Sequence, residues 1–175
     1  MTESELQTPY YIVDETRLRR NLELIKGVEQ RAGVTIIMAF KANALWRTFP
    51  IIKEYSSGFT ASSLNELRLG TETLGGKGHS YCPAYTEQTI GDYMAMSSHI
   101  TFNSLSQAER FAARAKEAGV SCGLRVNPQC SVIETDIYNP ALPGSRFGMS
   151  AEMLPERLPE EIEGLHFHAL CESTS

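Results

Sequence analysis

An apolar run that ends in a single lysine is the stretch of this sequence best suited to carry chemistry. The run extends from Ile36 to Phe40, ends at Lys41 and turns polar at Asn43. Its length and branched side chains predict a strand buried on both faces, as in parallel sheets covered by helices. Burying a charged amine is costly. Lys41 therefore either marks where the strand reaches water, or is a nucleophile held in a dry site to condense with carbonyl compounds.

Polar side chains also follow the other strands that the sequence predicts. The carboxyl ends of parallel strands meet at one edge, where active sites lie. We therefore expect one rim that carries all of these residues. Its members are Lys41, Ser62, Ser63, Pro83, Tyr85, Asn103, Arg125, Asn127, His168 and Cys171. Each type also has a simpler explanation, because serines cap helices, arginines pair with carboxylates and buried histidines are often only hydrogen-bonded.

Strands and helices alternate along most of the chain, which indicates βαβ units and a parallel sheet. Six strands are predicted to begin near residues 35, 58, 79, 99, 122 and 164. A helix-compatible segment follows each of the first five strands, at 46–55, 63–74, 87–96, 106–118 and 150–158. A further short strand is predicted at Pro9–Val13.

Local signals predict where several helices begin and end. Apolar residues at helical spacing predict a helix over 15–32, with Asp14 as its cap and Gly33 as its stop. Two S-x-x-E patterns, Ser63–Glu66 and Ser106–Glu109, predict capping boxes that open two later helices.

Two architectures fit this order of elements, a doubly wound open sheet and an incomplete (β/α)8 barrel. The 175 residues, 42% of them hydrophobic, suffice for one core. No G-x-G-x-x-G follows the first strand, which argues against a dinucleotide-binding sheet, and Gly75–Gly78 is explained by a turn. A complete barrel takes about 250 residues, so the predicted strands fall two short. The connection 127–148, rich in proline, has the composition of a functional loop.

Composition excludes several classes of protein. The formal net charge is −5, and the scattered basic residues form no stripe for nucleic acid or membrane surfaces. No stretch approaches the ~20 apolar residues of a membrane span, and the first residues lack a signal-peptide pattern. We therefore expect a cytoplasmic protein. Its cysteines should be free thiols; they are Cys82, Cys122, Cys130 and Cys171.

A metal site is a weaker alternative near the end of the chain. His166, His168 and Cys171 are types that bind zinc, and alternation along a strand would put both histidines on one face. No further cluster in the sequence supplies a fourth ligand, so we predict no metal.

Four motifs in order resemble the alanine-racemase-like pyridoxal phosphate enzymes, and within them the basic amino acid decarboxylases. Ala39–Ala44 resembles the segment that carries the family's Schiff-base lysine, and Leu124–Pro128 resembles its central barrel strand. Ser145–Gly148 resembles the S-[KR]-[FL]-G element, and Leu165–His168 resembles the strand whose last histidine stacks on the cofactor. The KANALW stretch at 41–46 and HFHALCE at 166–172 are more similar to the members that decarboxylate carboxylated polyamines, such as carboxynorspermidine and carboxyspermidine.

This resemblance implies pyridoxal 5'-phosphate as cofactor and a decarboxylase of norspermidine or spermidine biosynthesis. Lys41 would hold the cofactor and His168 would lie against its ring, both as catalytic residues. Arg125 and Arg146 would sit near its polar edge. Other enzymes of the same fold remain open alternatives, namely diaminopimelate or ornithine decarboxylases and amino acid racemases, as does a non-catalytic fragment that binds the cofactor.

The resemblance covers nearly all of the chain but only about the first half of such an enzyme. It implies that residues 1–14 include a strand that joins the family's β-domain, and that 15–175 form a partial cofactor-binding barrel. The family's members are homodimers, so a homodimer is implied for the full-length protein. The resemblance places the partner of the ring nitrogen and the phosphate loop after residue 175. We therefore expect the 175 residues alone to be inactive.

Overall fold

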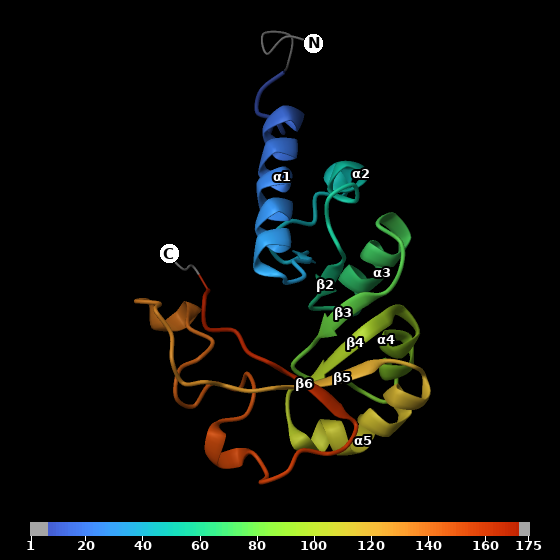
Figure 1. The fold of residues 1–175 in the computed structure, drawn as a ribbon, viewed down its shortest axis with the longest axis vertical. Helices are drawn as coiled ribbons and strands as arrows, with labels where there is room; N and C mark the ends of the chain where they lie inside the picture. The colour runs from blue at the N-terminus through green and yellow to red at the C-terminus, as the bar shows by residue number, and fades with distance from the viewer. Residues whose placement is uncertain (1–6, 172–175) are drawn as a thin grey trace.

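A parallel sheet of six strands forms the centre of the computed structural model, which describes residues 7–171 (Figure 1). The strands lie side by side in sequence order, and every neighbouring pair is parallel. A doubly wound sheet reverses this order at a switch point, whereas a barrel does not. The sheet is therefore an incomplete barrel, as predicted. Its strands are β1 (Met38–Ala39), β2 (Phe59–Ala61), β3 (Gly78–Tyr81), β4 (Ser97–Phe102), β5 (Ser121–Arg125) and β6 (Ile162–His166).

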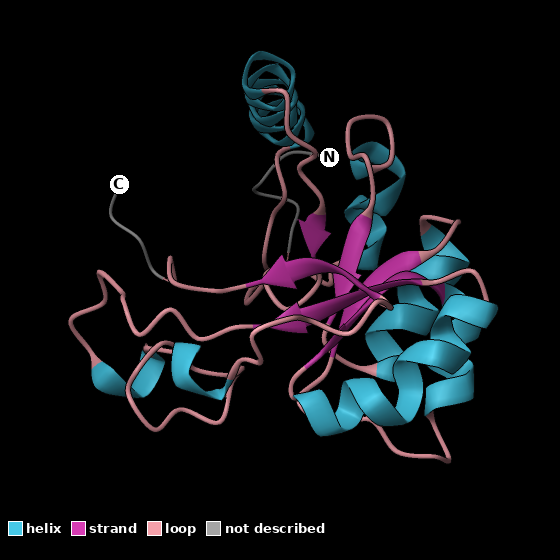
Figure 2. Cartoon of the chain, turned by 60° about the horizontal axis from the view of Figure 1, so that its bottom comes forward, coloured by secondary structure: helices cyan, strands magenta, loops and turns pink. Residues whose placement is uncertain are grey.

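Three helices pack together on one side of the strands, and a longer helix and a short one lie together at the β1 end of the sheet (Figures 1 and 2). No helix within residues 7–171 is long and apolar enough to cross a membrane. All four cysteines are free thiols. The helices are α1 (Glu15–Ala32), α2 (Phe49–Ile52), α3 (Leu64–Thr73), α4 (Ile90–Met96) and α5 (Leu105–Glu117).

Side chains alternate along the strands between the face that the helices cover and the opposite face. Phe59 and Ala61 of β2 are buried, while Thr60 between them is only half-buried. Ile100 and Phe102 of β4 are fully buried. Successive side chains of a strand point to opposite faces. The apolar core therefore lies between the sheet and α3–α5, and the other face is left for polar residues.

The first strand is shorter and less buried than the sequence predicts. Only Met38–Ala39 pair with β2, and Ile36 and Ile37 before them are half-buried and outside the strand. The reason is that β1 lies at an edge of the sheet and has a single neighbour of three residues. The expectation of a strand buried on both faces was wrong.

An aromatic stack nevertheless anchors the chain directly before Lys41. The ring of Phe40 lies between those of Phe49 and Phe59, with ring centroids 5.0 and 5.1 Å apart and planes within 14° of parallel. Helix α3 comes so close that a Cβ on Gly70 would lie 2.3 Å from the Phe59 ring. Glycine is required here because only a bare backbone can approach the rings this closely. The stack fixes the direction in which the following residue leaves the sheet.

Several local predictions need correction. Pro9–Val13 form no strand and are exposed, and residues 1–6 lie outside the described part of the chain. Ser104 rather than Ser106 caps α5, since its hydroxyl accepts the amide of Gln107 three residues on. The helix expected over 150–158 is reduced to one 3-10 turn, as Pro155 cannot donate a backbone hydrogen bond.

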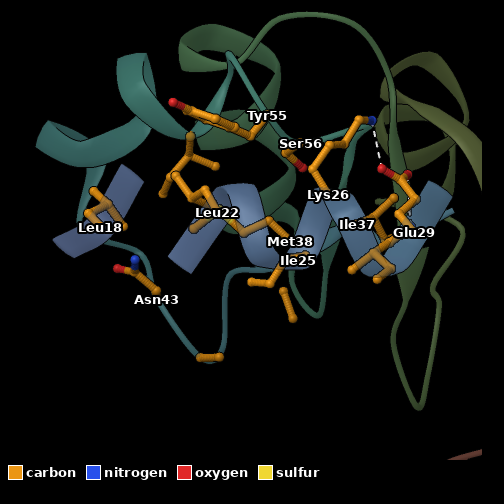
Figure 3. Close-up of a pocket in the computed structure, with 14 residues that line it drawn as sticks. Leu18, Leu22, Ile25, Lys26, Glu29, Ile37, Met38, Asn43, Tyr55 and Ser56 are labelled. Carbon is orange, nitrogen blue, oxygen red and sulfur yellow. Dashed lines mark hydrogen bonds and ion pairs between the residues drawn. The ribbon is translucent and has the colours of Figure 1, made fainter. Parts of the chain in front are cut away.

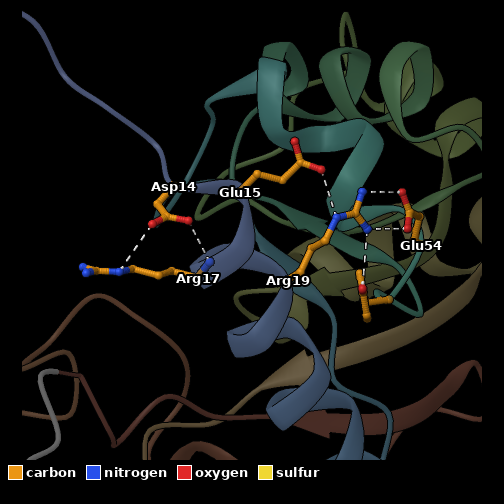
Figure 4. Close-up of polar contacts among 6 residues, drawn as sticks. Asp14, Glu15, Arg17, Arg19 and Glu54 are labelled. Atoms are coloured by element: carbon orange, nitrogen blue, oxygen red, sulfur yellow. Dashed lines mark hydrogen bonds and ion pairs between the residues drawn. The ribbon is translucent and has the colours of Figure 1, made fainter. Parts of the chain in front are cut away.

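Helix α1 forms as predicted, and an ion pair ties it to the turn that follows α2. The carboxylate of Asp14 accepts the amide of Arg17 at 3.0 Å, and the helix ends before Gly33. Arg19 donates to Glu54 at 2.6 and 3.1 Å (Figure 4). Such exposed pairs contribute little each. They fix the orientation of α1 more than its stability.

A buried carboxylate joins the end of α1 to the two loops beside it. Glu29 is 8% exposed and receives hydrogen bonds from the amide of Ile36 at 3.1 Å and the hydroxyl of Ser57 at 2.6 Å. Lys26 contacts its other oxygen at 2.6 Å, at the end of an apolar groove of about 210 Å³ between α1 and β1 (Figure 3). Together these contacts lower the pKa of Glu29 to about 2, and the contact with Lys26 has the largest effect.

We predict that Glu29→Gln destabilises the protein at neutral pH and that the difference narrows in acid. Because the folded pKa of about 2 lies below the ordinary 4.5, the unfolded chain binds the proton first, so this contribution is present above about pH 4.5 and is lost toward pH 2. Urea unfolding of both proteins at pH 7 and pH 3 measures it. The matched control is Glu23→Gln on the exposed side of α1, expected within about 0.5 kcal/mol of wild type. An equal loss at both pH values would contradict the prediction.

Candidate functional site

A cavity of about 350 Å³ opens at the carboxyl ends of the strands, on the face that the helices leave free. Segments from both edges of the sheet contribute to it, together with the long connection between β5 and β6. Its lining residues are Lys41, Thr60, Ser62, Tyr81, Pro83, Arg125, Tyr138, Pro140, Phe147, His166, His168 and Cys171. The cavity is thus the single rim that the sequence predicts, and six of the ten residues expected on the rim line it.

The remaining predicted rim residues support the fold around the cavity. Ser63 caps α3 by accepting the amide of Glu66 at 3.2 Å. Tyr85 is 5% exposed in the core, where its hydroxyl donates to backbone carbonyls. Asn103 and Asn127 hydrogen-bond to the connection that follows β5. Their side chains were placed wrongly because a position after a strand does not reveal which way the chain turns.

Arg146, predicted to bind the cofactor, does not line the cavity. Arg146 is exposed, and its guanidinium lies 5.1 Å from the centre of the Phe147 ring. The neighbouring Phe147 lines the cavity instead. The loop that carries both residues therefore presents its aromatic side chain, and not its cation, to the site.

Tyr81 and Phe147 are the main lining residues that the sequence interpretation missed, and it considered His166 only as a metal ligand. Tyr81 and His166 end β3 and β6, so counting the last inward-facing residue of each strand would have found them. His166 and His168 both line the cavity while Phe167 between them is 61% exposed, which confirms the predicted alternation. Within residues 7–171, no three His, Cys, Asp or Glu side chains come together as a metal site would need.

Arg125 is a buried cation held by aromatic rings. It ends β5 and is 5% exposed, with its guanidinium 4.4 Å from the ring of Tyr81 and 5.2 Å from that of Phe147. No ion pair to Arg125 exists among the described residues, and its Nε is buried without a hydrogen-bond partner. Burial lowers its pKa, but an arginine stays charged in proteins. The site thus contains a positive charge that is free to meet an anion.

Lys41 lies at the mouth of the cavity. It occupies the turn directly after β1, opposite in direction to the buried Phe40, and the residue as a whole is exposed. The described residues therefore do not hold its amine in a dry site, contrary to the expectation for a buried strand. It remains close enough to the two histidines that its charge helps to lower the pKa of each.

The histidines are kept neutral by their surroundings. Burial, followed by the charges of Arg125, His168 and Lys41, lowers the pKa of His166 to about 4. Burial also lowers the pKa of His168. The Nδ1 atom of His166 is buried without a hydrogen-bond partner. The cavity thus combines one amine, one guanidinium and two neutral imidazoles.

We predict that His166 titrates near pH 4 and destabilises the fold in mild acid. Because its folded pKa is below the ordinary 6.5, the unfolded chain binds the proton first, so stability falls as the pH drops from about 6.5 to about 4. NMR titration of the imidazole measures the pKa. His166→Asn should reduce the dependence of the free energy of unfolding on pH between about 6.5 and 4. A pKa above 6 for His166 would show the prediction to be wrong.

Comparison with known proteins finds close relatives among decarboxylases. No known family profile matches the chain. It is 40% identical over 170 residues to the carboxyaminopropylagmatine decarboxylase of Synechocystis, with 97% of this chain and 44% of that protein aligned. It is 38% identical over 171 residues to the carboxynorspermidine/carboxyspermidine decarboxylase of Campylobacter jejuni, with 98% and 44% aligned. The corresponding Herminiimonas arsenicoxydans enzyme is 36% identical, with 96% and 46% aligned.

Solved structures agree. The carboxynorspermidine decarboxylase of Campylobacter jejuni, complexed with norspermidine, superposes with a TM-score of 0.82 at 36% identity, over 95% of this chain and 42% of that one. Diaminopimelate decarboxylase of Helicobacter pylori, at 19% identity and a TM-score of 0.75, shares the fold. The chain spans somewhat under half the length of the curated relatives it matches. Over that span, the chain is similar to carboxynorspermidine decarboxylases in both sequence and fold.

Proposed function

We propose that this chain supplies the lysine side of the active site in a pyridoxal phosphate-dependent decarboxylase of carboxylated polyamines. The observation that carries the proposal is the meeting of Lys41, Arg125 and His168 at one cavity. These residues lie up to 127 positions apart in the sequence. The packing of the sheet and its helices does not require them to meet. A lysine amine beside a cation and neutral imidazoles suits an anionic aldehyde cofactor.

The lining residues fit such a cofactor. A volume of about 350 Å³ lies within the ~300–1,000 Å³ of small-molecule sites. Two buried polar atoms without a partner in the protein, Arg125 Nε and His166 Nδ1, are available to a ligand. When bound, pyridoxal phosphate supplies an electron sink for the charge left on the substrate carbon after CO2 departs.

Each residue then has a role set by its chemistry. The amine of Lys41 is the nucleophile that would hold the cofactor through its aldehyde. His168, whose pKa is lowered by burial, would meet the cofactor as an uncharged ring. Arg125 provides fixed positive charge. Arg146 is the weakest of the predicted cofactor-binding residues because it lies outside the cavity lining.

The names of the relatives support a substrate class for the proposed enzyme. Their names favour carboxynorspermidine or carboxyspermidine, and the 40% identical relative makes carboxyaminopropylagmatine a second candidate. The positive lining suits the carboxylate end of such molecules. None of the described residues that line the cavity is acidic, so we expect the substrate's amines to be met by residues outside this set. The homodimer and the cytoplasmic location stay predictions.

We predict that the chain binds pyridoxal phosphate through Lys41. Added cofactor should produce a visible absorbance band, and borohydride should fix the cofactor to one lysine, identified by peptide mass spectrometry. Lys41→Ala should lose both signals, while Lys53→Ala, an exposed lysine outside the cavity lining, should keep them. Label on Lys26, Lys53 or Lys77 would mean that the site is misassigned.

We also predict which substrate is decarboxylated. A full-length protein that contains these residues should release CO2 from carboxynorspermidine or carboxyaminopropylagmatine. Lys41→Ala in that protein should reduce the rate by at least about 10³-fold. The 175 residues alone should release none. Preferential release from diaminopimelate would favour the alternative enzymes of this fold and would count against the polyamine substrates.

A further inference from the structure

Asn103 makes three hydrogen bonds that join β3 and β4 to the loop 145–148. Its Oδ1 accepts the hydroxyl of Tyr81 and the amide of Gly148, each at 2.8 Å, and its Nδ2 donates to the carbonyl of Arg146 at 2.8 Å. Both lone pairs of the amide oxygen and one of its two N–H donors are thereby used. The bond to Gly148 spans 45 positions of the sequence. One side chain thus fastens the end of the long connection to the rim of the sheet.

The two groups that Asn103 holds are the two that enclose Arg125. Tyr81 contributes the ring 4.4 Å from the guanidinium, and Phe147, flanked by the two residues that Asn103 binds, contributes the ring at 5.2 Å. The loop backbone also rests on the arginine directly. A Cβ on Gly148, whose φ is +84°, would lie 2.8 Å from Arg125 Cγ. Moving the loop would therefore uncover the cation.

We propose that Asn103 is a positioning residue that sets the orientation of the Arg125 guanidinium toward the cavity. It does so by hydrogen bonds that hold the loop of Phe147 close to Tyr81, so that the guanidinium of Arg125 lies between the two aromatic rings. Arg125 has no carboxylate partner among the described residues, and aromatic faces are its main restraint. The value of this orientation for an anionic ligand rests on the proposed function. The positioning itself does not, and can be measured without any ligand.

The direct test observes the arginine in the ligand-free chain. With ¹⁵N-labelled arginine, the Arg125 Nε–H signal is identified by its loss in Arg125→Lys. In wild type we expect it to be shifted by the two rings and slow to exchange with water. Asn103→Ala should move it toward the position of exposed arginines and speed its exchange by at least about tenfold. Asn65→Ala, at an exposed asparagine of α3, is the matched control and should leave the signal unchanged.

A second variant covers the case in which Asn103→Ala does not fold. Asn103→Asp keeps an oxygen that can accept from Tyr81 and Gly148, but it replaces the donor to Arg146 with a second acceptor and adds a negative charge. It should show an intermediate shift and faster exchange of the same signal. If the Arg125 signal matches wild type in every folded variant of Asn103, the proposal is overturned.

A double-mutant cycle links the positioning to binding. Asn103→Ala should weaken pyridoxal phosphate binding several-fold in the wild-type background and should have no further effect when Arg125 is already Met. Additive effects would show that Asn103 does not act through Arg125 and would overturn the proposal. Absence of binding by the wild-type chain would contradict the proposed function, and the arginine signal would still decide the role of Asn103.

Discussion

The alternation of side chains along parallel strands is the constraint on which the site depends. Just past β1, the backbone of Phe40 continues the pairing with β2 and its ring lies in the aromatic stack beneath α3, while the next residue, Lys41, lines the cavity. The same rule turns Tyr81, Arg125 and His166 into the cavity from the ends of β3, β5 and β6. Because all carboxyl ends lie at one edge, residues far apart in sequence meet there. The packing of aromatic residues on the buried face of the sheet thus determines which side chains point into the cavity on the other face.

The charged and polar groups of the cavity are arranged to bind a ligand and contribute little to the stability of the fold. Arg125 is restrained by two aromatic faces, each worth about 0.5–2 kcal/mol, where a carboxylate would be the usual partner. His166 avoids the penalty of a second buried charge by remaining neutral, with a pKa near 4. The result is a positive cavity with unpaired donors. A bound anion would complete it, which is what the proposed cofactor and a substrate carboxylate provide.

Local sequence signals predicted best the features that a short segment determines by itself. The caps of α1 and α3 and the order of the six strands were foreseen from single residues and spacing. The signals failed at the edges. β1 has one neighbouring strand, and Pro9–Val13 pair with no strand within residues 7–171. On β6, Leu165 is 55% exposed although its sequence is typical of a buried strand. An apolar run shows that a segment can be buried, but burial needs a partner that local pattern does not reveal.

The sequence by itself determined the alternating order of strands and helices and the candidate chemistry of Lys41, Arg125 and His168, because periodicity, caps and residue types are local properties. Only the tertiary structure decided that Lys41 is exposed at the cavity mouth, that Arg146 lies outside the lining, and that Asn103 fastens the loop over Arg125. These outcomes depend on contacts between segments more than 40 positions apart. Such contacts are set by how the strands assemble, and no single segment encodes them.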